Sequence, residues 1–163
     1  MKIISFVGHS GSGKTTLIEK LIFESKSRGM HVATIKHTHH SVPIDTPGKD
    51  SWRYTQAGAE ISMLVTGDSL NLVVTGIAEF ELKQLAQRFS GEVDLVFAEG
   101  FSQDNVNKIE VLRRACSSLS RCDIADGLIA MVTDVDEVYP QLPHFCLEDI
   151  SGIIEFILQR ADS

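Results

Sequence analysis

A short segment near the amino terminus has the residue types and spacing that hold a polyphosphate. GHSGSGKT, Gly8–Thr15, matches G-x-x-x-x-G-K-S/T and stands between an apolar run and a segment with helical periodicity. Its glycines permit the backbone angles that turn successive N–H groups toward phosphate oxygens. Lys14 is expected to reach the β- and γ-phosphates, and the Thr15 hydroxyl to ligate Mg²⁺. The expected nucleotide-binding residues are Gly8, His9, Ser10, Gly11, Ser12, Gly13, Lys14, Thr15 and Thr16.

A second acid for the metal is expected from the strand beside the loop strand. The segment VDLVFAEG carries Asp94 and Glu99 at opposite ends of one apolar run, about 16 Å apart along a strand. Ligands of open α/β sheets bind outside the carboxyl ends of the strands, which favours Glu99 as the metal and catalytic acid. Gly100 is then expected to let the backbone pass near a γ-phosphate. The alternative for Glu99 is a carboxylate that caps a neighbouring helix.

The tetrapeptide Asp45-x-x-Gly48 has the form of the switch motif that GTPases place beside the terminal phosphate. The preceding HHSVPI contains a proline and few buriable aliphatic residues, so no central strand is expected to carry Asp45 to the phosphates. We therefore interpret this segment as a turn, followed by a short helix to about Ala57 with Asp50 or Ser51 as its cap.

Histidines gather just before that turn. His37, His39 and His40 follow the second expected strand at its carboxyl end, where they could bind an anion or a metal. Alternation along an extended chain would point His39 and His40 to opposite sides, which disfavours a single metal site.

The pair Thr133-Asp134 ends another apolar run and could select the base. A carboxylate can accept hydrogen bonds from both N1–H and the N2 amine of guanine, whereas adenine presents an unprotonated N1. Asp134 therefore favours GTP over ATP. The alternative is that Thr133-Asp134 only begins the turn TDVDEV.

These residues need a sheet whose strands end at one edge. Short apolar or β-branched runs predict strands at Lys2–Val7, His31–Ile35, Leu95–Ala98, Ile109–Leu112 and Leu128–Val132. Helical spacing follows the Gly8–Thr15 loop as far as Gly29 and recurs at Glu79–Phe89 and Ile150–Leu158. Strands alternating with helices predict an α/β, three-layer phosphate-loop NTPase fold with a mostly parallel sheet.

Two further strands are predicted as a hairpin. Ile61–Thr66 and Leu70–Thr75 flank Gly67-Asp68, and we expect them to add antiparallel strands to the sheet. Between Arg114 and Asp126 the pattern leaves a short helix and a loop equally open.

Composition limits the class of protein. A chain of 163 residues, 43% of them hydrophobic, can bury one core, so a single domain over residues 1–163 is expected. A net charge of −7 disfavours general nucleic-acid binding. With no apolar run long enough for a membrane span, and with Cys116, Cys122 and Cys146 expected as free thiols, the chain is expected to be soluble and cytoplasmic.

Five blocks taken in order resemble a known family. GHSGSGKTTL, KHTHH, DTPGKDSWRYTQAGA, DLVFAEGF and KIEVLR are similar to the molybdopterin-guanine dinucleotide biosynthesis protein B family, while the chain from Arg114 onward matches loosely. The resemblance implies a protein that binds GTP and Mg²⁺, hydrolyses GTP weakly and is commonly a homodimer. It also implies a partner, the nucleotidyltransferase that joins GMP to molybdopterin, and allows contact with molybdopterin itself.

The same resemblance implies roles for particular positions. Glu99 would be the Walker-B-type acid, and Thr133-Asp134 would lie at the guanine. A signature loop, for which a pterin-phosphate or γ-phosphate contact is plausible, would contain His37, Thr38, His39, Asp45, Lys49, Asp50 and Arg53.

The leading hypothesis is a GTP-binding accessory protein of molybdenum cofactor assembly. Lys14 and Mg²⁺ would stabilise the transferring phosphoryl group, and turnover should be slow because no water-positioning glutamine is evident and Arg53 is only a guess for an arginine finger. One alternative is an ATP-dependent small-molecule kinase with Asp45 or Asp50 as general base. The other is a metallochaperone GTPase whose histidines hold nickel or zinc.

Overall fold

The polypeptide divides into a larger unit with a parallel sheet and a smaller unit with a hairpin. The computed structural model describes residues 1–38, 42, 45–76, 80–135 and 138–160. The first unit contains Met1–His37 and Glu81–Ser163, and the second contains Thr38–Phe80. The expectation of a single domain over residues 1–163 stays a prediction.

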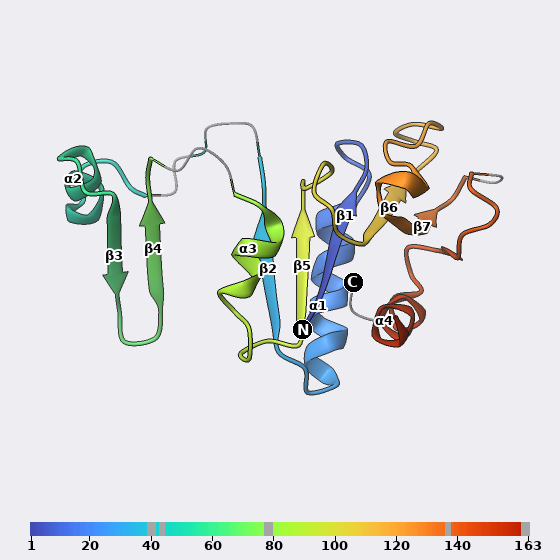
Figure 1. Cartoon of the computed structure of the whole chain (residues 1–163), viewed down its shortest axis with the longest axis horizontal. Helices are drawn as coiled ribbons and strands as arrows, with labels where there is room; N and C mark the ends of the chain where they lie inside the picture. Colours follow the sequence, from blue (N-terminus) through green and yellow to red (C-terminus); the bar gives the residue numbers. More distant parts are fainter. Residues whose placement is uncertain (39–41, 43–44, 77–79, 136–137, 161–163) are drawn as a thin grey trace. The chain divides into compact units, whose positions relative to one another are not determined.

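The first unit is built on a six-stranded sheet of order β2-β5-β1-β6-β7-β8, in which every pair is parallel (Figure 1). The strands are β1 (Lys2–Val7), β2 (Val32–Lys36), β5 (Leu95–Glu99), β6 (Lys108–Leu112), β7 (Leu128–Thr133) and β8 (His144–Phe145). The helices are α1 (Lys14–Ser27), α3 (Leu82–Gln87), the 3₁₀ turn η1 (Ile124–Asp126) and α4 (Ile150–Gln159). This architecture confirms the predicted α/β fold with a mostly parallel sheet.

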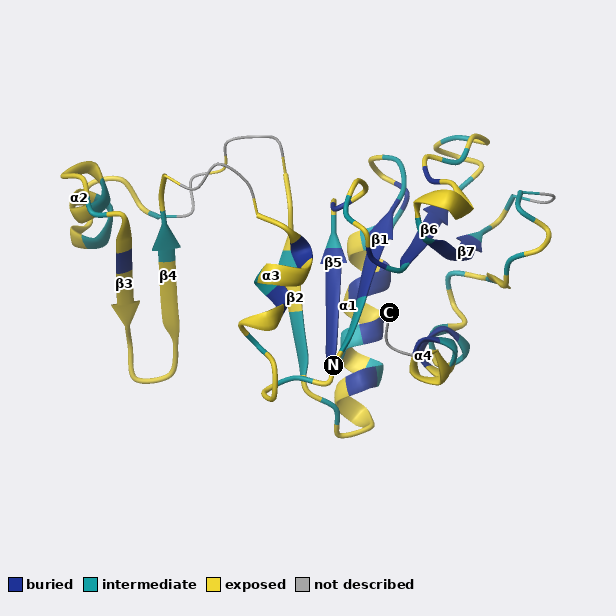
Figure 2. Cartoon of the chain, viewed as in Figure 1, coloured by how far each residue is buried: buried dark blue, intermediate teal, exposed yellow. Residues whose placement is uncertain are grey.

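Alternation along the central strands divides their side chains between two helical layers. Ile4 and Phe6 of β1 belong to the core that α1 and α4 cover, while Ile3 packs with Leu82 of α3 in a second cluster. Strands covered on both faces are apolar along their whole length, and Figure 2 shows β5 buried over almost all of it. The sheet is therefore a rigid frame for the loops at its carboxyl edge.

The second unit forms its own antiparallel sheet from β3 (Ile61–Val65) and β4 (Leu70–Val74). The expectation that this hairpin adds strands to the large sheet is wrong: β3 and β4 pair with each other, and the large sheet contains neither. The hairpin is packed instead on α2 (Asp50–Gln56), because buried Ser62 donates its hydroxyl to the Ser51 carbonyl oxygen at 3.4 Å.

The expected cap of α2 is also wrong. Lys49 occupies the N-cap position with extended backbone, and no side chain caps the helix there. Asp50 is the first helical residue, where its carboxylate faces the positive end of the helix without capping it.

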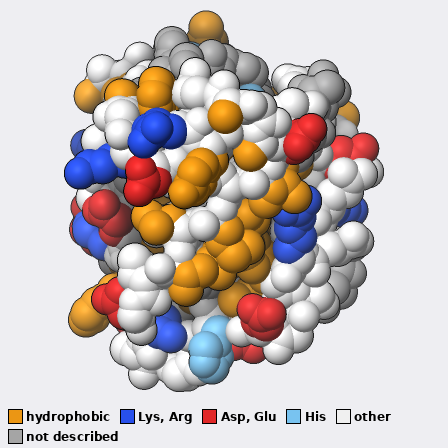
Figure 3. Space-filling model, turned by 90° about the vertical axis from the view of Figure 1, so that its left-hand side faces the viewer, with side chains coloured by type: hydrophobic (Ala, Val, Ile, Leu, Met, Phe, Trp, Pro, Cys, Tyr) orange, Lys and Arg blue, Asp and Glu red, His pale blue; other side chains and the backbone are white. Residues whose placement is uncertain are grey.

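One face of the hairpin has apolar side chains open to solvent. Residues that alternate with Ser62 on β3 and their cross-strand partners on β4 point to this side, and Met63 lies opposite Leu72. Figure 3 looks from the side of α2 and β3 and shows hydrophobic side chains gathered on the surface. We call the surface formed by the exposed side chains of Ile61, Met63, Val65, Leu70 and Leu72 the apolar hairpin face.

The remaining expectations concern thiols, membranes and the segment from Arg114 to Asp126. Cys116, Cys122 and Cys146 are free cysteines, as expected. None of the described helices is long and apolar enough to cross a bilayer. The segment from Arg114 to Asp126 contains both a loop and a short helix, since turns lead into η1.

Candidate functional site

The Gly8–Thr15 loop joins β1 to α1 at the carboxyl edge of the sheet. Gly8, Gly11 and Gly13 have φ angles of 138°, 76° and 94°, a backbone conformation that residues other than glycine rarely adopt. A Cβ on Gly8 would overlap the backbone carbonyl of Val111, so the loop lies directly on the end of β6. The loop leads into α1, whose N-terminus adds partial positive charge there.

Ser12 gives this loop an unused polar group. The residue is 1% exposed, and its hydroxyl oxygen has no hydrogen-bond partner within the described part of the chain. Buried hydroxyls are normally bonded, because leaving one unpaired costs about 1–3 kcal/mol. An unsatisfied hydroxyl in a glycine-rich loop fits a site that takes up an external polar group.

Lys14 folds back over its own loop. Its ammonium donates to the carbonyl oxygens of Gly8 at 3.1 Å and His9 at 2.7 Å. Burial lowers the pKa of Lys14, the Glu99 carboxylate opposes this by raising it, and the neighbouring charges of Arg121 and Lys36 lower it, with Cys116 raising it least. The ammonium thus lies near both Glu99 and two other basic side chains.

Glu99 ends β5, which pairs directly with the loop strand β1. One oxygen of its carboxylate accepts from the Thr15 hydroxyl at 3.0 Å, and the other lies 3.4 Å from the Lys36 ammonium. Asp94 precedes the same strand and accepts from the His31 backbone N–H at 2.8 Å. The structure therefore places Glu99, and not Asp94, beside Thr15.

Gly100 makes a close approach within the sheet edge, while its expected approach to a γ-phosphate stays a prediction. Its φ is 96°, and a Cβ there would overlap the backbone carbonyl of His37. The His37 backbone N–H also donates to the backbone carbonyl oxygen of Glu99 at 2.8 Å, and its ring lies 5.3 Å from that of Phe101. These contacts tie the end of β2 to β5, so the need for glycine arises within the sheet edge.

The predicted histidine cluster lies largely beyond the described residues. His39 and His40 fall outside them, and His37 stays with the sheet edge. Within the described ranges, no group of three His, Cys, Asp or Glu side chains is placed to hold a metal ion.

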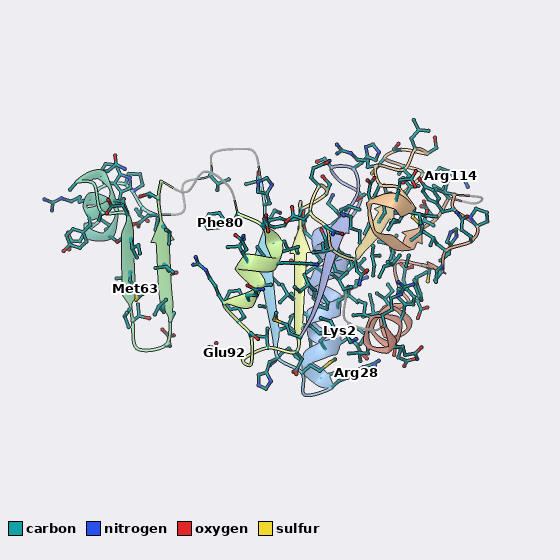
Figure 4. The ribbon with its side chains drawn as sticks, in the orientation of Figure 1. Lys2, Arg28, Met63, Phe80, Glu92 and Arg114 are labelled. Carbon is teal, nitrogen blue, oxygen red and sulfur yellow. The ribbon has the colours of Figure 1, made fainter. Side chains whose placement is uncertain are left out.

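Thr133 and Asp134 end β7 in a turn. The Thr133 hydroxyl accepts from the Val135 N–H at 2.9 Å, the geometry of the turn that was the alternative interpretation. The Asp134 carboxylate accepts from the Arg114 N–H at 2.7 Å and lies 3.8 Å from Arg113 Nε. Figure 4 shows Arg114 at the upper edge of the first unit, the edge toward which β1 runs, with Lys2 and Arg28 toward the opposite end. Contact of Asp134 with a guanine stays a prediction.

The signature-loop residues belong to the second unit, apart from His37. Asp45 accepts from the Thr46 N–H at 2.7 Å through one oxygen, while its other oxygen is buried without a partner among the described residues. Arg53 lies 3.7 Å from the Asp50 carboxylate, one turn back along α2. Asp45 is thus held in a local turn, as expected for this segment.

Sequence reasoning missed two charged residues inside β6. Lys108 is 1% and Glu110 0% exposed, although both stand in the apolar strand beside β1. Charged side chains are rarely buried this fully, so the alternation of charge and aliphatic residues in KIEVL was the available signal.

Comparisons with known proteins agree on one family. The model described as molybdopterin guanine dinucleotide synthesis protein B matches residues 3–134. The chain is 38% identical over 152 residues to the molybdopterin-guanine dinucleotide biosynthesis adapter protein of Haemophilus influenzae, covering 93% of this chain and 83% of that protein. Its Escherichia coli counterpart is 31% identical over 161 residues, covering 96% and 91%. The crystal structure of Bacillus subtilis MobB matches with a TM-score of 0.75 at 25% identity, covering 100% of both chains.

Proposed function

The chain belongs to the molybdopterin guanine dinucleotide synthesis protein B family, and from this premise we propose that it binds GTP and Mg²⁺ as an adapter in the synthesis of that dinucleotide. The observation that carries the nucleotide part is the hydrogen bond of 3.0 Å between Thr15 and Glu99 at the end of the Gly8–Thr15 loop. It brings together the hydroxyl and the carboxylate that magnesium sites of this kind use.

The residues present fit a magnesium nucleotide. Thr15 and Glu99 would hold the metal, both through oxygen atoms, and the unpaired Ser12 hydroxyl and the Lys14 ammonium would take phosphate oxygens. Bound Mg²⁺ would neutralise charge on the terminal phosphates. Lys14 would orient them and spread their charge, and Asp134 would favour guanine over adenine.

Hydrolysis is proposed to be slow. Lys14 and the loop N–H groups can stabilise phosphoryl charge. No glutamine stands in the loop or at the end of β5 to orient an attacking water. The adapter role then depends on nucleotide binding and on a partner, the nucleotidyltransferase that joins GMP to molybdopterin, rather than on rapid turnover. Molybdopterin itself is a further proposed ligand.

The apolar hairpin face supports a second copy of the chain as a partner. Ile61, Met63 and Val65 are 63%, 54% and 65% exposed, which is unusual for neighbouring aliphatic residues on one strand. Pairing this face with itself would bury a continuous apolar surface, as two-fold dimer interfaces do. We propose a homodimer formed through this face.

Competition between GTP and ATP in the presence of Mg²⁺ tests the nucleotide proposal. The wild-type chain should prefer GTP, and Asp134→Asn should reduce that preference while leaving the phosphate contacts intact. Equal or tighter binding of ATP would overturn the guanine assignment and favour a small-molecule kinase. Absence of any Mg²⁺-dependent nucleotide binding would overturn the proposal as a whole.

A further inference from the structure

The loop that follows β6 is anchored by a fully buried carboxylate outside the proposed magnesium site. Glu110 is 0% exposed and pairs in register with Val7, the residue before the Gly8–Thr15 loop. Its carboxylate accepts from the Ser120 hydroxyl, from the Arg121 N–H at 2.8 Å and from the Cys122 N–H at 3.3 Å. One side chain thus determines where these three consecutive residues lie.

Stability alone is a poor reason for this arrangement. Taking a carboxylate out of water is costly, and a well-packed apolar residue often stabilises a fold as well or better. No lysine or arginine of the described residues forms an ion pair with Glu110, and the buried Lys108 ammonium donates to the carbonyls of Asp104 and Asp126 instead. We infer that the role of Glu110 is to position the segment from Ser120 to Cys122.

That segment is also tied to the Gly8–Thr15 loop. The His9 ring Nε2 lies 3.0 Å from the Leu119 carbonyl oxygen in a hydrogen bond. Arg121 follows Leu119 by two residues in the chain, its backbone N–H donates to Glu110 of β6, and its side chain is exposed. Its positive charge is close enough to contribute to the lowered pKa of Lys14.

Three basic side chains, Lys14, Lys36 and Arg121, gather at the Gly8–Thr15 loop. Glu99 lies 3.4 Å from Lys36 and is the carboxylate that acts on the Lys14 ammonium, while Arg121 acts on it as a second cation. This local excess of cations occurs in a chain whose net charge is −7. Cations concentrated at one loop of an acidic protein indicate that an anion with several charges belongs there.

We propose that Arg121 contacts the phosphate groups of the nucleotide bound at the Gly8–Thr15 loop, and that Glu110 is the positioning residue that holds Arg121 there. The planar guanidinium matches phosphate oxygens in two parallel hydrogen bonds. Arg121 is therefore a second candidate, besides Arg53, for the arginine that would contact the phosphates. This inference rests on the proposed nucleotide site.

Titration calorimetry of GTP, GDP and GMP with Mg²⁺ tests the contact. Arg121→Ala should weaken GTP binding about 10- to 100-fold, the range for hydrogen bonds to charged groups, and the loss should shrink as phosphates are removed. Arg121→Lys should recover part of the affinity. Arg88→Ala, an exposed arginine at the end of α3, is the matched control and should bind as wild type does.

The outcomes separate the two proposals. If the wild-type chain binds no guanine nucleotide, the proposed function fails and this inference fails with it. If the wild type binds GTP and Arg121→Ala binds it equally well, the proposed function stands and the arginine contact alone is overturned.

A double-mutant cycle tests the positioning role. Glu110→Gln should weaken GTP binding several-fold in the wild-type background and cause no further loss in the Arg121→Ala background, because its effect passes through Arg121. An equal loss in both backgrounds would show a general structural effect and overturn the role. If Glu110→Gln does not fold, Ser120→Ala, which removes one donor to Glu110, enters the same cycle.

Discussion

Strands β5 and β3 have similar apolar sequences and opposite surroundings. LVFAE of β5 is buried at its first four positions, whereas ISMLV of β3 is exposed everywhere except Ser62. The difference lies in the neighbours, because β5 has strands on both sides and helical layers on both faces, while β3, among the described residues, pairs with β4 and packs on α2. The buried strand positions a carboxylate, and the exposed strand offers a surface to a partner.

Truncating one leucine in each strand tests this difference in burial and should give the largest effect of the changes considered. Leu95→Ala should destabilise the chain by about 2–5 kcal/mol, because Leu95 is 1% exposed and its loss leaves a cavity. Leu64→Ala, at 48% exposure, should cost less than about 1 kcal/mol. Chemical denaturation followed by circular dichroism measures both. Equal losses would show that the hairpin unit depends on burial as much as the sheet does.

Substituting the acidic residues at the two ends of β5 tests which end of the strand belongs to the nucleotide site. Glu99→Gln should weaken Mg²⁺-dependent GTP binding about 10-fold or more, since it removes the charge beside Thr15. Asp94→Asn, at the opposite end, should leave that affinity unchanged. Fluorescence titration with a GTP analogue, with and without Mg²⁺, provides the measurement. A comparable loss from Asp94→Asn would contradict the assignment of the site to the carboxyl edge.

A charge placed on the apolar hairpin face should act on assembly and spare nucleotide binding. Leu72→Asp introduces a carboxylate into a face that we propose to be buried between two copies, so the dimer dissociation constant should rise about 10-fold or more. Sedimentation velocity over a concentration series measures it. Unchanged sedimentation would remove this face from the proposed interface, and a matching fall in GTP affinity would show that the two regions are coupled.

The smallest expected effect concerns pH. Burial lowers the Lys14 pKa, so between that lowered pKa and 10.5 the unfolded chain binds more protons and stability rises with pH. Lys14→Met should therefore be more stable than wild type near neutral pH, and this advantage should shrink toward pH 10.5. Denaturation at both pH values tests it, with exposed Lys20→Met as the control on the same helix. A constant difference would exclude the burial explanation.

Local sequence patterns predicted the structure correctly where the conformation of a strand or loop depends mainly on its own residues. The Gly8–Thr15 loop follows an apolar strand and precedes a helix, and Glu99 ends the strand beside it. Strand β8 was not predicted, because two residues carry no periodicity. Residue type favours Asp50 as the cap of α2, yet Lys49 has the extended backbone that the cap position needs.

Residue types and short-range periodicity were enough to predict the order of the longer strands and helices, the glycine-rich loop and the acid at the end of β5. The pairing of the hairpin apart from the large sheet could not be predicted in this way, since strand pairing depends on contacts between distant segments. The burial of Glu110 against Ser120, Arg121 and Cys122 likewise depends on the folded chain. A carboxylate within an aliphatic strand has no visible partner until the following loop folds back over it.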